Sequence, residues 1–176
     1  HAPGLVGSLL VGLTAGKTLA WVLDKPFLAV NHLAAHLHAT RMADPGAPYP
    51  AVTLLASGGH TAVYWSPEDG MDEAIGRTVD DAAGEAFDKA AKVLELGFPG
   101  GPLIDKLAAS GNPKAIDFPR GHGPGPYDFS FSGLKTAVLY KVRGPRGEGE
   151  LHLTEVEKAD LAASFQEAVV EVLVER

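Results

Sequence analysis

Residues 51–66 read Ala51-Val-Thr-Leu-Leu-Ala-Ser-Gly-Gly-His-Thr-Ala-Val-Tyr-Trp-Ser66. Two runs with the composition of β-strands flank the pair Gly58-Gly59. Because glycine accepts a positive φ without steric cost, this pattern predicts strands over 51–57 and 61–66 joined by a tight hairpin turn. The chain therefore contains a sheet and is more than a bundle of helices.

Helices dominate the sequence that follows the hairpin, after a run at 73–79 that is compatible with a third strand. Apolar residues at helical spacing predict the first helix, and Gly97 is suited to end it. Ser132 is a good N-cap, and Thr154 with Glu157 matches the capping box. Helices are predicted over residues 81–96, 100–109, 132–142 and from 154 to the end of the chain. Prolines and glycines predict loops over 113–127 and 144–150.

Upstream of the hairpin, residues 5–23 form the most apolar stretch of the chain. Lys17 interrupts it, and Gly12 and Gly16 would let another element pack closely against one face. We expect a buried helix of a non-membrane protein here. A strand is predicted over 27–30, and a helix follows at 32–42. Together these elements predict an α/β fold.

The composition sets limits on function. Of 176 residues, 45% are hydrophobic and 34 are glycine or proline (21 Gly plus 13 Pro), which indicates a real core with many turns. The net charge is −7, and the sequence shows no basic stripe of the kind that isolated nucleic-acid-binding domains carry. The chain has no cysteine, which excludes disulfides and thiolate metal sites and fits a reducing compartment.

Two histidines lie four residues apart on the helix predicted at 32–42. His32 and His36 would face the same side, where both imidazoles can reach one metal ion, and a third ligand would have to come from elsewhere. The alternative is two unrelated histidines. His38 points to a different face. A zinc-protease helix needs a glutamate directly after the first histidine. Leu33 occupies that position, so the protease mechanism lacks its general base.

The glycine pair also has two interpretations. Backbone N–H groups of Ser57-Gly58-Gly59-His60-Thr61 could receive an anion, but the pattern alone favours a plain hairpin turn. No Gly-Lys-Ser/Thr follows, so this is not a Walker A loop.

Acidic residues gather at the start of the helix predicted at 81–96. Carboxylates at that end often only complement the helix dipole. Asp81, Glu85 and Asp88 share a face, however, and could accept hydrogen bonds from ribose hydroxyls. Gly100-Gly101, before the next helix, is a second point where a ligand could approach the backbone.

These signals occur in an order that resembles one family, the tRNA N6-adenosine threonylcarbamoyltransferases, once labelled glycoproteases. The matching stretches are Pro3-Gly-Leu-Val-Gly-Ser-Leu-Leu-Val-Gly12, Asn31-His-Leu-Ala-Ala-His36, Leu55-Ala-Ser-Gly-Gly-His-Thr61, Asp80-Asp-Ala-Ala-Gly-Glu-Ala-Phe-Asp-Lys89, Phe98-Pro-Gly-Gly-Pro102 and Asp128-Phe-Ser-Phe-Ser-Gly-Leu-Lys-Thr136. The long acidic stretch and the aromatic-serine stretch are the most specific.

The resemblance implies the two-lobed actin/Hsp70-like (ribonuclease H-like) ATPase fold, present here in part. Residues 1–50 would close the first lobe and carry the metal-binding helix, and residues 51–176 would belong to the second. The chain is expected to be the central part of a longer protein. The family's N-terminal phosphate-binding segment, its later adenosine motif and a C-terminal metal-binding aspartate have no counterpart in it.

The resemblance also implies site residues. His32 and His36 match the family's metal ligands, for one divalent ion per subunit that is usually described as iron, with zinc as the alternative. Further residues match contacts to the substrate: Leu55, Ala56, Ser57, Gly58, Gly59, Asp88 and Gly101. No catalytic residue is identified.

The implied reaction moves threonylcarbamoyl from threonylcarbamoyl-AMP to N6 of the adenosine beside the anticodon in tRNAs reading codons that start with A. Implied partners are that adenylate or an ATP-like nucleotide, tRNA and the other subunits of the transfer complex, in the cytoplasm and without a membrane. The 176 residues alone are expected to be inactive and to bind metal weakly. The alternatives are a metalloprotease, an inactive homologue that stabilises a partner, and a sugar or acetate kinase, for which no catalytic acid is identifiable.

Overall fold

The computed structural model describes residues 6–69, 71–147 and 152–175, and it divides into two compact units. The first unit comprises the chain up to Thr53 together with Ser66–Asp72, and the second comprises Leu54–Trp65 and the chain from Glu73 onward. The expected division into lobes after residue 50 stays a prediction. Residues 1–5 and 148–151, which include parts of the expected first helix and of the 144–150 loop, lie outside the described residues.

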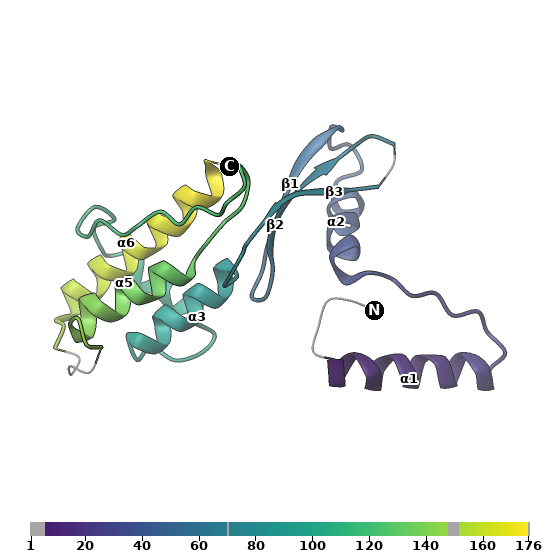
Figure 1. The fold of residues 1–176 in the computed structure, drawn as a ribbon, viewed down its shortest axis with the longest axis horizontal. Helices are drawn as coiled ribbons and strands as arrows, with labels where there is room; N and C mark the ends of the chain where they lie inside the picture. Colours follow the sequence, from purple (N-terminus) through teal and green to yellow (C-terminus); the bar gives the residue numbers. More distant parts are fainter. Residues whose placement is uncertain (1–5, 70, 148–151, 176) are drawn as a thin grey trace. The chain divides into compact units, whose positions relative to one another are not determined.

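The first unit contains helices α1 (Val6–Val22) and α2 (His32–Ala43), joined by an extended segment (Figure 1). The side-chain oxygen of Asn31 accepts hydrogen bonds from the backbone N–H groups of Leu33 and Ala34, at 2.9 and 3.2 Å. This N-cap fixes where α2 begins. At the other end of α2, Arg41 donates to the carbonyl of Pro67 at 3.0 Å and pairs with Asp72 at 3.3 Å.

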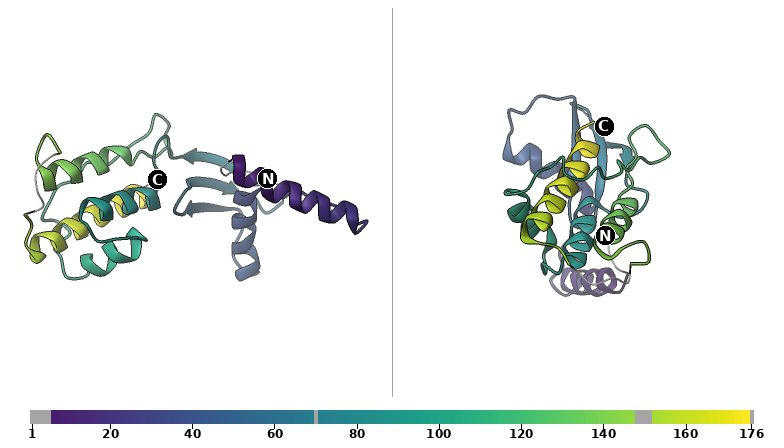
Figure 2. Two further views of the ribbon diagram at one scale, coloured as in Figure 1. Left: turned by 90° about the horizontal axis from the view of Figure 1, so that it is seen from below. Right: turned by 90° about the vertical axis from the view of Figure 1, so that its left-hand side faces the viewer.

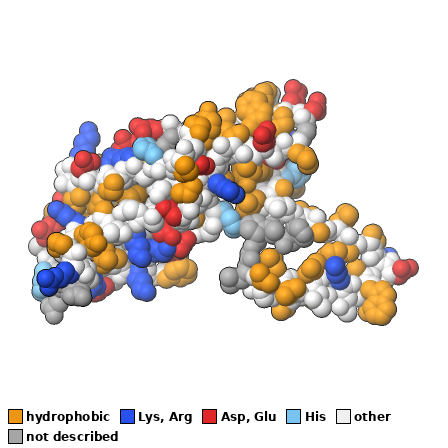
Figure 3. Space-filling view, viewed as in Figure 1, with side chains coloured by type: hydrophobic (Ala, Val, Ile, Leu, Met, Phe, Trp, Pro, Cys, Tyr) orange, Lys and Arg blue, Asp and Glu red, His pale blue; other side chains and the backbone are white. Residues whose placement is uncertain are grey.

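Helix α1 forms as expected, but the prediction that it is buried was wrong for the described residues. None of its side chains is buried, and Trp21 is 84% exposed. Figure 3 shows its hydrophobic side chains on the surface. A helix is buried only where another surface covers it. Here the ring of Phe27 packs beside Gly16, and a Cβ added at Gly16 would lie 2.9 Å from that ring. None of the described helices is long and apolar enough to cross a membrane.

The strand predicted over 27–30 was also wrong. These residues adopt no regular secondary structure in the segment between the two helices. An apolar run becomes a strand only when a neighbouring strand supplies hydrogen-bond partners for its backbone, and the sequence pattern carries no information about that neighbour.

The predicted hairpin strands are confirmed as β1 (Ala51–Ala56) and β2 (Thr61–Ser66), followed by β3 (Glu73–Arg77). The sheet order is β1-β2-β3, and β2 runs antiparallel to β3. The third strand ends two residues earlier than expected because the chain then pairs elsewhere. Phe129 donates to the carbonyl of Arg77 at 3.1 Å, and Val79 donates to that of Phe129 at 3.0 Å.

The second unit is completed by four helices, which Figures 1 and 2 show gathered together. They are α3 (Ala83–Val93), α4 (Gly100–Ala108), α5 (Ser132–Arg143) and α6 (Glu155–Val174). Helix α4 packs against α3 and α6, and α5 packs against α3. The capping box of Thr154 and Glu157 is confirmed at the start of α6.

The core of this unit lies between the helices. The ring of Phe165 on α6 is edge-on to those of Phe87 and Phe118, with centroids 5.2 and 6.5 Å away. Alanines at 86, 90 and 91 are fully buried on α3. Their small side chains allow α4 and α5 to approach α3 closely, and this holds α3 rigidly against the rest of the unit.

Helix α3 ends in a Schellman motif. We expected Gly97 to end this helix, but it does not occupy the left-handed position of the motif. Glu95 does, with φ of 59°. The N–H of Leu96 donates to the carbonyl of Ala91 at 3.0 Å, and that of Glu95 to Lys92 at 3.2 Å, which is the bonding pattern of this motif. Gly97 has φ of 108° one residue beyond the motif and turns the chain toward α4.

Candidate functional site

The loop between β1 and β2 is fastened to the first turn of α3. The N–H of Ala83 donates to the buried hydroxyl of Thr61 at 2.8 Å, and the N–H of Gly84 donates to the carbonyl of Ser57 at 3.2 Å. These two bonds satisfy N–H groups that have no partner within the helix. They also place the glycine pair against the positive end of α3.

Gly84 has to be glycine for this contact. A Cβ at Gly84 would lie 2.6 Å from the Cα of Gly58 and 2.6 Å from the carbonyl oxygen of Ser57. Neither Gly58 nor Gly59 has a φ in the left-handed region, so this turn does not use the positive φ that glycine allows. An added Cβ at either residue would meet nothing within 4 Å, and this open space lets a ligand approach the backbone.

Asp88 lies one turn further along the same face of α3. Its Oδ1 accepts a hydrogen bond from the N–H of Gly100 at 2.7 Å. This bond leaves further acceptor sites on the carboxylate for a ligand. Gly100 also packs closely, since an added Cβ would lie 2.7 Å from the Cα of Asp88, whereas a Cβ at Gly101 would meet nothing within 4 Å.

The structure therefore brings several of the expected substrate-binding residues to one face of α3. Ser57 and Gly58 lie at its first turn, and Asp88 lies with the Gly100-Gly101 pair at its second. Leu55 and Ala56 are the last residues of β1 and lead into the loop. Glycine N–H groups, a helix N-terminus and a carboxylate one turn away are suited to a phosphate followed by a ribose.

The other acids at and just before the start of α3 have a different role. Lys89 pairs with Asp81 at 2.5 Å and with Glu85 at 2.7 Å. The hydrogen bond from Lys89 lowers the pKa of Glu85, and the bonds to Asp81 and Glu85 raise the pKa of Lys89. Of the three carboxylates expected on a shared face, Asp81 and Glu85 are therefore both paired with Lys89. Asp88 is the one bound to the N–H of Gly100.

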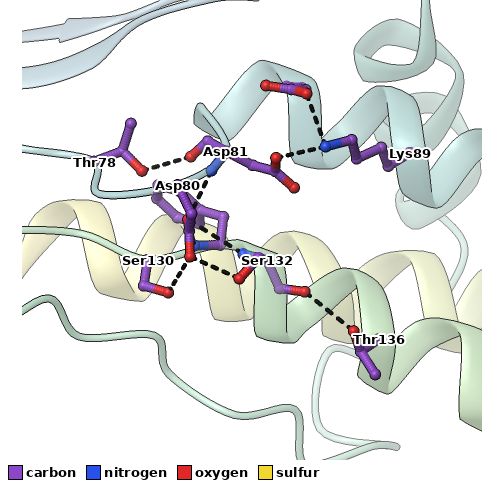
Figure 4. Close-up of polar contacts among 9 residues, drawn as sticks. Thr78, Asp80, Asp81, Lys89, Ser130, Ser132 and Thr136 are labelled. Carbon is purple, nitrogen blue, oxygen red and sulfur yellow. Dashed lines mark hydrogen bonds and ion pairs between the residues drawn. The ribbon is translucent and has the colours of Figure 1, made fainter.

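Asp80 is a residue whose role the sequence did not indicate (Figure 4). Its carboxylate accepts hydrogen bonds from the hydroxyls of Ser130 and Ser132, at 2.6 and 2.7 Å. It also accepts from the N–H groups of Phe131 and Ser132, at 2.8 and 3.3 Å. Burial disfavours the charged form, but these hydrogen bonds outweigh that effect and lower the pKa of Asp80 to about 2.

This carboxylate caps helix α5 from a distant part of the chain. The expected N-cap, Ser132, is instead the first helical residue, and the residue at the cap position, Phe131, offers no side-chain acceptor. The role that a local serine plays at most helix starts is taken by Asp80. It thereby fixes α5 against the turn from which α3 begins, and so supports the position of α3.

The expected metal ligands lie in the first unit. His32 and His36 are on one face of α2, with their Nε2 atoms 3.1 Å apart and their rings edge-on. At this distance one ring N–H can donate to the other ring nitrogen, in a direction that depends on the tautomer. The described residues contain no group of three or more His, Asp or Glu side chains able to hold a metal, so a metal ion on His32 and His36 would need a further ligand from outside them.

Comparisons with known proteins bear on the whole chain. The family model described as tRNA N6-adenosine threonylcarbamoyltransferase matches residues 1–176. Curated proteins with that name are similar throughout: 56% identical in Symbiobacterium thermophilum over 100% of this chain and 50% of the relative, and 54% in a Cyanothece species over 99% and 51%. The relative from Thermotoga neapolitana is 51% identical over 100% of this chain and 52% of its own length. The chain thus spans about half the length of the curated relatives it matches.

Proposed function

Because the chain belongs to the tRNA N6-adenosine threonylcarbamoyltransferase family, we propose that the protein containing it transfers threonylcarbamoyl from threonylcarbamoyl-AMP to tRNA. The acceptor is N6 of the adenosine beside the anticodon in tRNAs that read codons starting with A. The observation that carries this proposal is that the glycine loop and Asp88, with Gly100 bound to it, lie along one face of α3, and that Gly101 follows Gly100 with open space around it.

The adenylate half of the substrate fits this face. Backbone N–H groups around Gly58 and Gly59 would hold the phosphate near the positive end of α3. Asp88 would accept a hydrogen bond from a ribose hydroxyl, and the open space at Gly101 would admit the sugar. AMP is the leaving group of the reaction, so donors fixed around its phosphate stabilise the charge that develops there.

The transfer itself is an acyl substitution. The N6 amine of adenine attacks the carbonyl carbon, a C–N bond forms, the C–O bond to the phosphate breaks, and the amine loses a proton. AMP leaves with the electron pair. An aromatic amine is a weak nucleophile, so the protein contributes mainly by holding the two reactants in place and by stabilising the leaving group.

The two histidines of α2 fit a metal ion. Nitrogens bound at about 2.0–2.1 Å to one tetrahedral ion lie about 3.3 Å apart, close to the 3.1 Å between the Nε2 atoms of His32 and His36. We propose that they hold a divalent ion, iron or alternatively zinc, with a third ligand from outside the described residues. Such an ion would act as a Lewis acid and as a template for the threonylcarbamoyl group.

The remaining parts of the proposal follow from the family. The full-length protein would have the two-lobed actin/Hsp70-like fold, with residues 1–50 at the end of the first lobe and residues 51–176 in the second. It would act in the cytoplasm with tRNA and the partner subunits of a transfer complex. The net charge of −7 suits an arrangement in which other surfaces supply much of the positive charge that tRNA requires.

The test is transfer of labelled threonylcarbamoyl to tRNA by the full-length protein with its partner subunits. His36→Ala should abolish most of the transfer and lower the bound metal measured by elemental analysis. His38→Ala is the matched control, since His38 is exposed on the same helix and lies on a different face. It should change neither readout.

The other outcomes separate the alternatives. Undiminished transfer by His36→Ala would keep the activity and remove the histidine pair from the mechanism. No transfer by the unmutated protein would favour the inactive homologue. A metalloprotease would instead cleave peptides in a reaction that depends on His32 and His36, although Leu33 stands where its general base would be.

A further inference from the structure

Arg41, in the last turn of α2, makes three different contacts with other segments of the first unit. Its Nη2 donates to the carbonyl of Pro67 at 3.0 Å and pairs with Oδ1 of Asp72 at 3.3 Å. Its guanidinium carbon lies 4.2 Å from the centre of the Tyr49 ring, within the range of a cation–π contact. The side chain of Arg41 is 28% exposed and that of Asp72 is 21% exposed, so solvent screens this pair less than it screens a surface ion pair.

The three partners of Arg41 flank the three strands of the sheet. Tyr49 lies two residues before β1, Pro67 directly follows β2, and Asp72 directly precedes β3. A guanidinium group is planar and offers both hydrogen-bond donors and a flat face that stacks on an aromatic ring. One side chain can therefore hold all three segments at the same time, and it ties the end of α2 to them.

The other contacts of α2 hold it less firmly in place. Leu37 is its one buried side chain. Asn31 caps the first turn, but its two hydrogen bonds go to N–H groups of α2 itself. The hydroxyl of Thr40 likewise donates to the carbonyl of Leu37 within the helix. Arg41 thus supplies a polar tie to distant segments that neither the cap nor the buried leucine provides.

The position of α2 matters for the proposed metal ion. His32 and His36 are four residues apart on one helix, so the helix itself fixes the 3.1 Å between their Nε2 atoms. The ion also needs a ligand from outside the described residues. The distance from that ligand to the two histidines depends on where α2 is held as a whole. Because metal–ligand distances tolerate errors of only about 0.2 Å, a helix that is held less firmly should bind the ion less tightly.

We propose that Arg41 is a positioning residue for the metal-binding helix. Through Tyr49, Pro67 and Asp72 it holds α2 where the two histidines can share an ion with the further ligand. Arg41 supplies no ligand of its own. This inference rests on the proposed metal site at His32 and His36.

The test is titration of the metal-free full-length protein with Co²⁺ by isothermal titration calorimetry, at a temperature where circular dichroism shows each variant to be folded. Arg41→Met keeps the length of the side chain and loses its charge and donors. It should weaken Co²⁺ binding about threefold to tenfold, less than the roughly 10–100-fold loss that follows removal of a group bound directly to a ligand. Arg41→Lys keeps the charge but not the planar fork, and should give an intermediate affinity. Lys17→Met removes another exposed cation of the first unit and should have no effect.

Two substitutions of Tyr49 test the aromatic contact separately. Tyr49→Phe keeps the ring face under the guanidinium and should bind Co²⁺ as the unmutated protein does. Tyr49→Leu removes the ring and should weaken binding about twofold to threefold. Should Arg41→Met not fold, these two variants and Arg41→Lys decide the question.

The outcomes separate the role of Arg41 from the metal site. A loss of affinity in Arg41→Met that Arg41→Lys partly restores supports positioning, because a change in stability alone leaves the affinity of a fully folded protein unchanged. Unchanged Co²⁺ affinity in both Arg41→Met and Tyr49→Leu would overturn the role of Arg41. The metal site would still stand if His36→Ala abolishes binding. If the unmutated protein binds no Co²⁺, or His36→Ala binds it equally well, the metal site is refuted and the role of Arg41 with it.

Discussion

Asp80 joins two parts of the second unit that are about fifty residues apart in sequence, and removing its charge should weaken that unit measurably. Asp80→Asn keeps the size and the acceptor oxygen that faces the N–H groups of Phe131 and Ser132. The hydroxyls of Ser130 and Ser132 can rotate to accept from the new amide. The substitution therefore removes the charge and leaves most of the hydrogen bonds in place.

The magnitude follows from the pKa. A fall from 3.8 to about 2 corresponds to roughly 2 kcal/mol, since one pKa unit equals about 1.4 kcal/mol. Asp80 is exposed, so solvent screening reduces the expected loss for Asp80→Asn to about 1 kcal/mol. Asp80→Ala also removes the acceptors of both N–H groups and should cost about 2–3 kcal/mol.

The assay is urea denaturation of the full-length protein, followed as a function of pH. The folded-state pKa is lower than the unfolded one, so the ionised carboxylate stabilises the fold at pH values above about 4. That stabilisation is lost as the pH falls toward 2. The difference in free energy of unfolding between the unmutated protein and Asp80→Asn should therefore shrink over this interval. Asp117→Asn, at a fully exposed side chain of the same unit, is the control and should be neutral.

Two results would refute this reasoning. One is equal stability of Asp80→Asn and the unmutated protein at pH 7. The other is a difference that stays constant between pH 4 and pH 2. Hydrogen exchange adds a local readout, since the first amides of α5 should lose protection in Asp80→Ala before those of α6.

Two further substitutions test how the glycine loop is held against α3. Gly84→Ala should destabilise the protein by about 1–3 kcal/mol and weaken AMP binding, because its Cβ would lie 2.6 Å from the Cα of Gly58. Gly133→Ala is the control, since Gly133 has open space around it, and it should change neither property. Thermal denaturation and calorimetry measure the two effects, and unchanged stability and AMP binding in Gly84→Ala would contradict the close approach. Thr61→Val should lower the free energy of unfolding in urea by about 1–3 kcal/mol, since it leaves the N–H of Ala83 without its acceptor. A decrease below about 0.5 kcal/mol would show that this bond contributes little.

The sequence by itself determined the features that depend on neighbours a few residues apart. The hairpin strands, the capping box of Thr154 and Glu157 and the pairing of His32 with His36 on one helical face were predictable, because strand alternation and the helical repeat are local properties. The motifs also identified the family, which the comparisons then established over residues 1–176. The same motifs marked Ser57–Gly59, Asp88 and Gly101 as candidate substrate contacts.

Tertiary structure decided the features that depend on distant partners. Whether α1 is buried, whether 27–30 pairs as a strand and whether Ser132 or Asp80 caps α5 are settled by surfaces and atoms far along the chain. The same holds for the acids of α3, where Lys89 binds Asp81 and Glu85 while the N–H of Gly100 binds Asp88. A sequence pattern records which side chains are available, but the close packing of α3 against Gly58 and Gly100 selects which of them face the glycines.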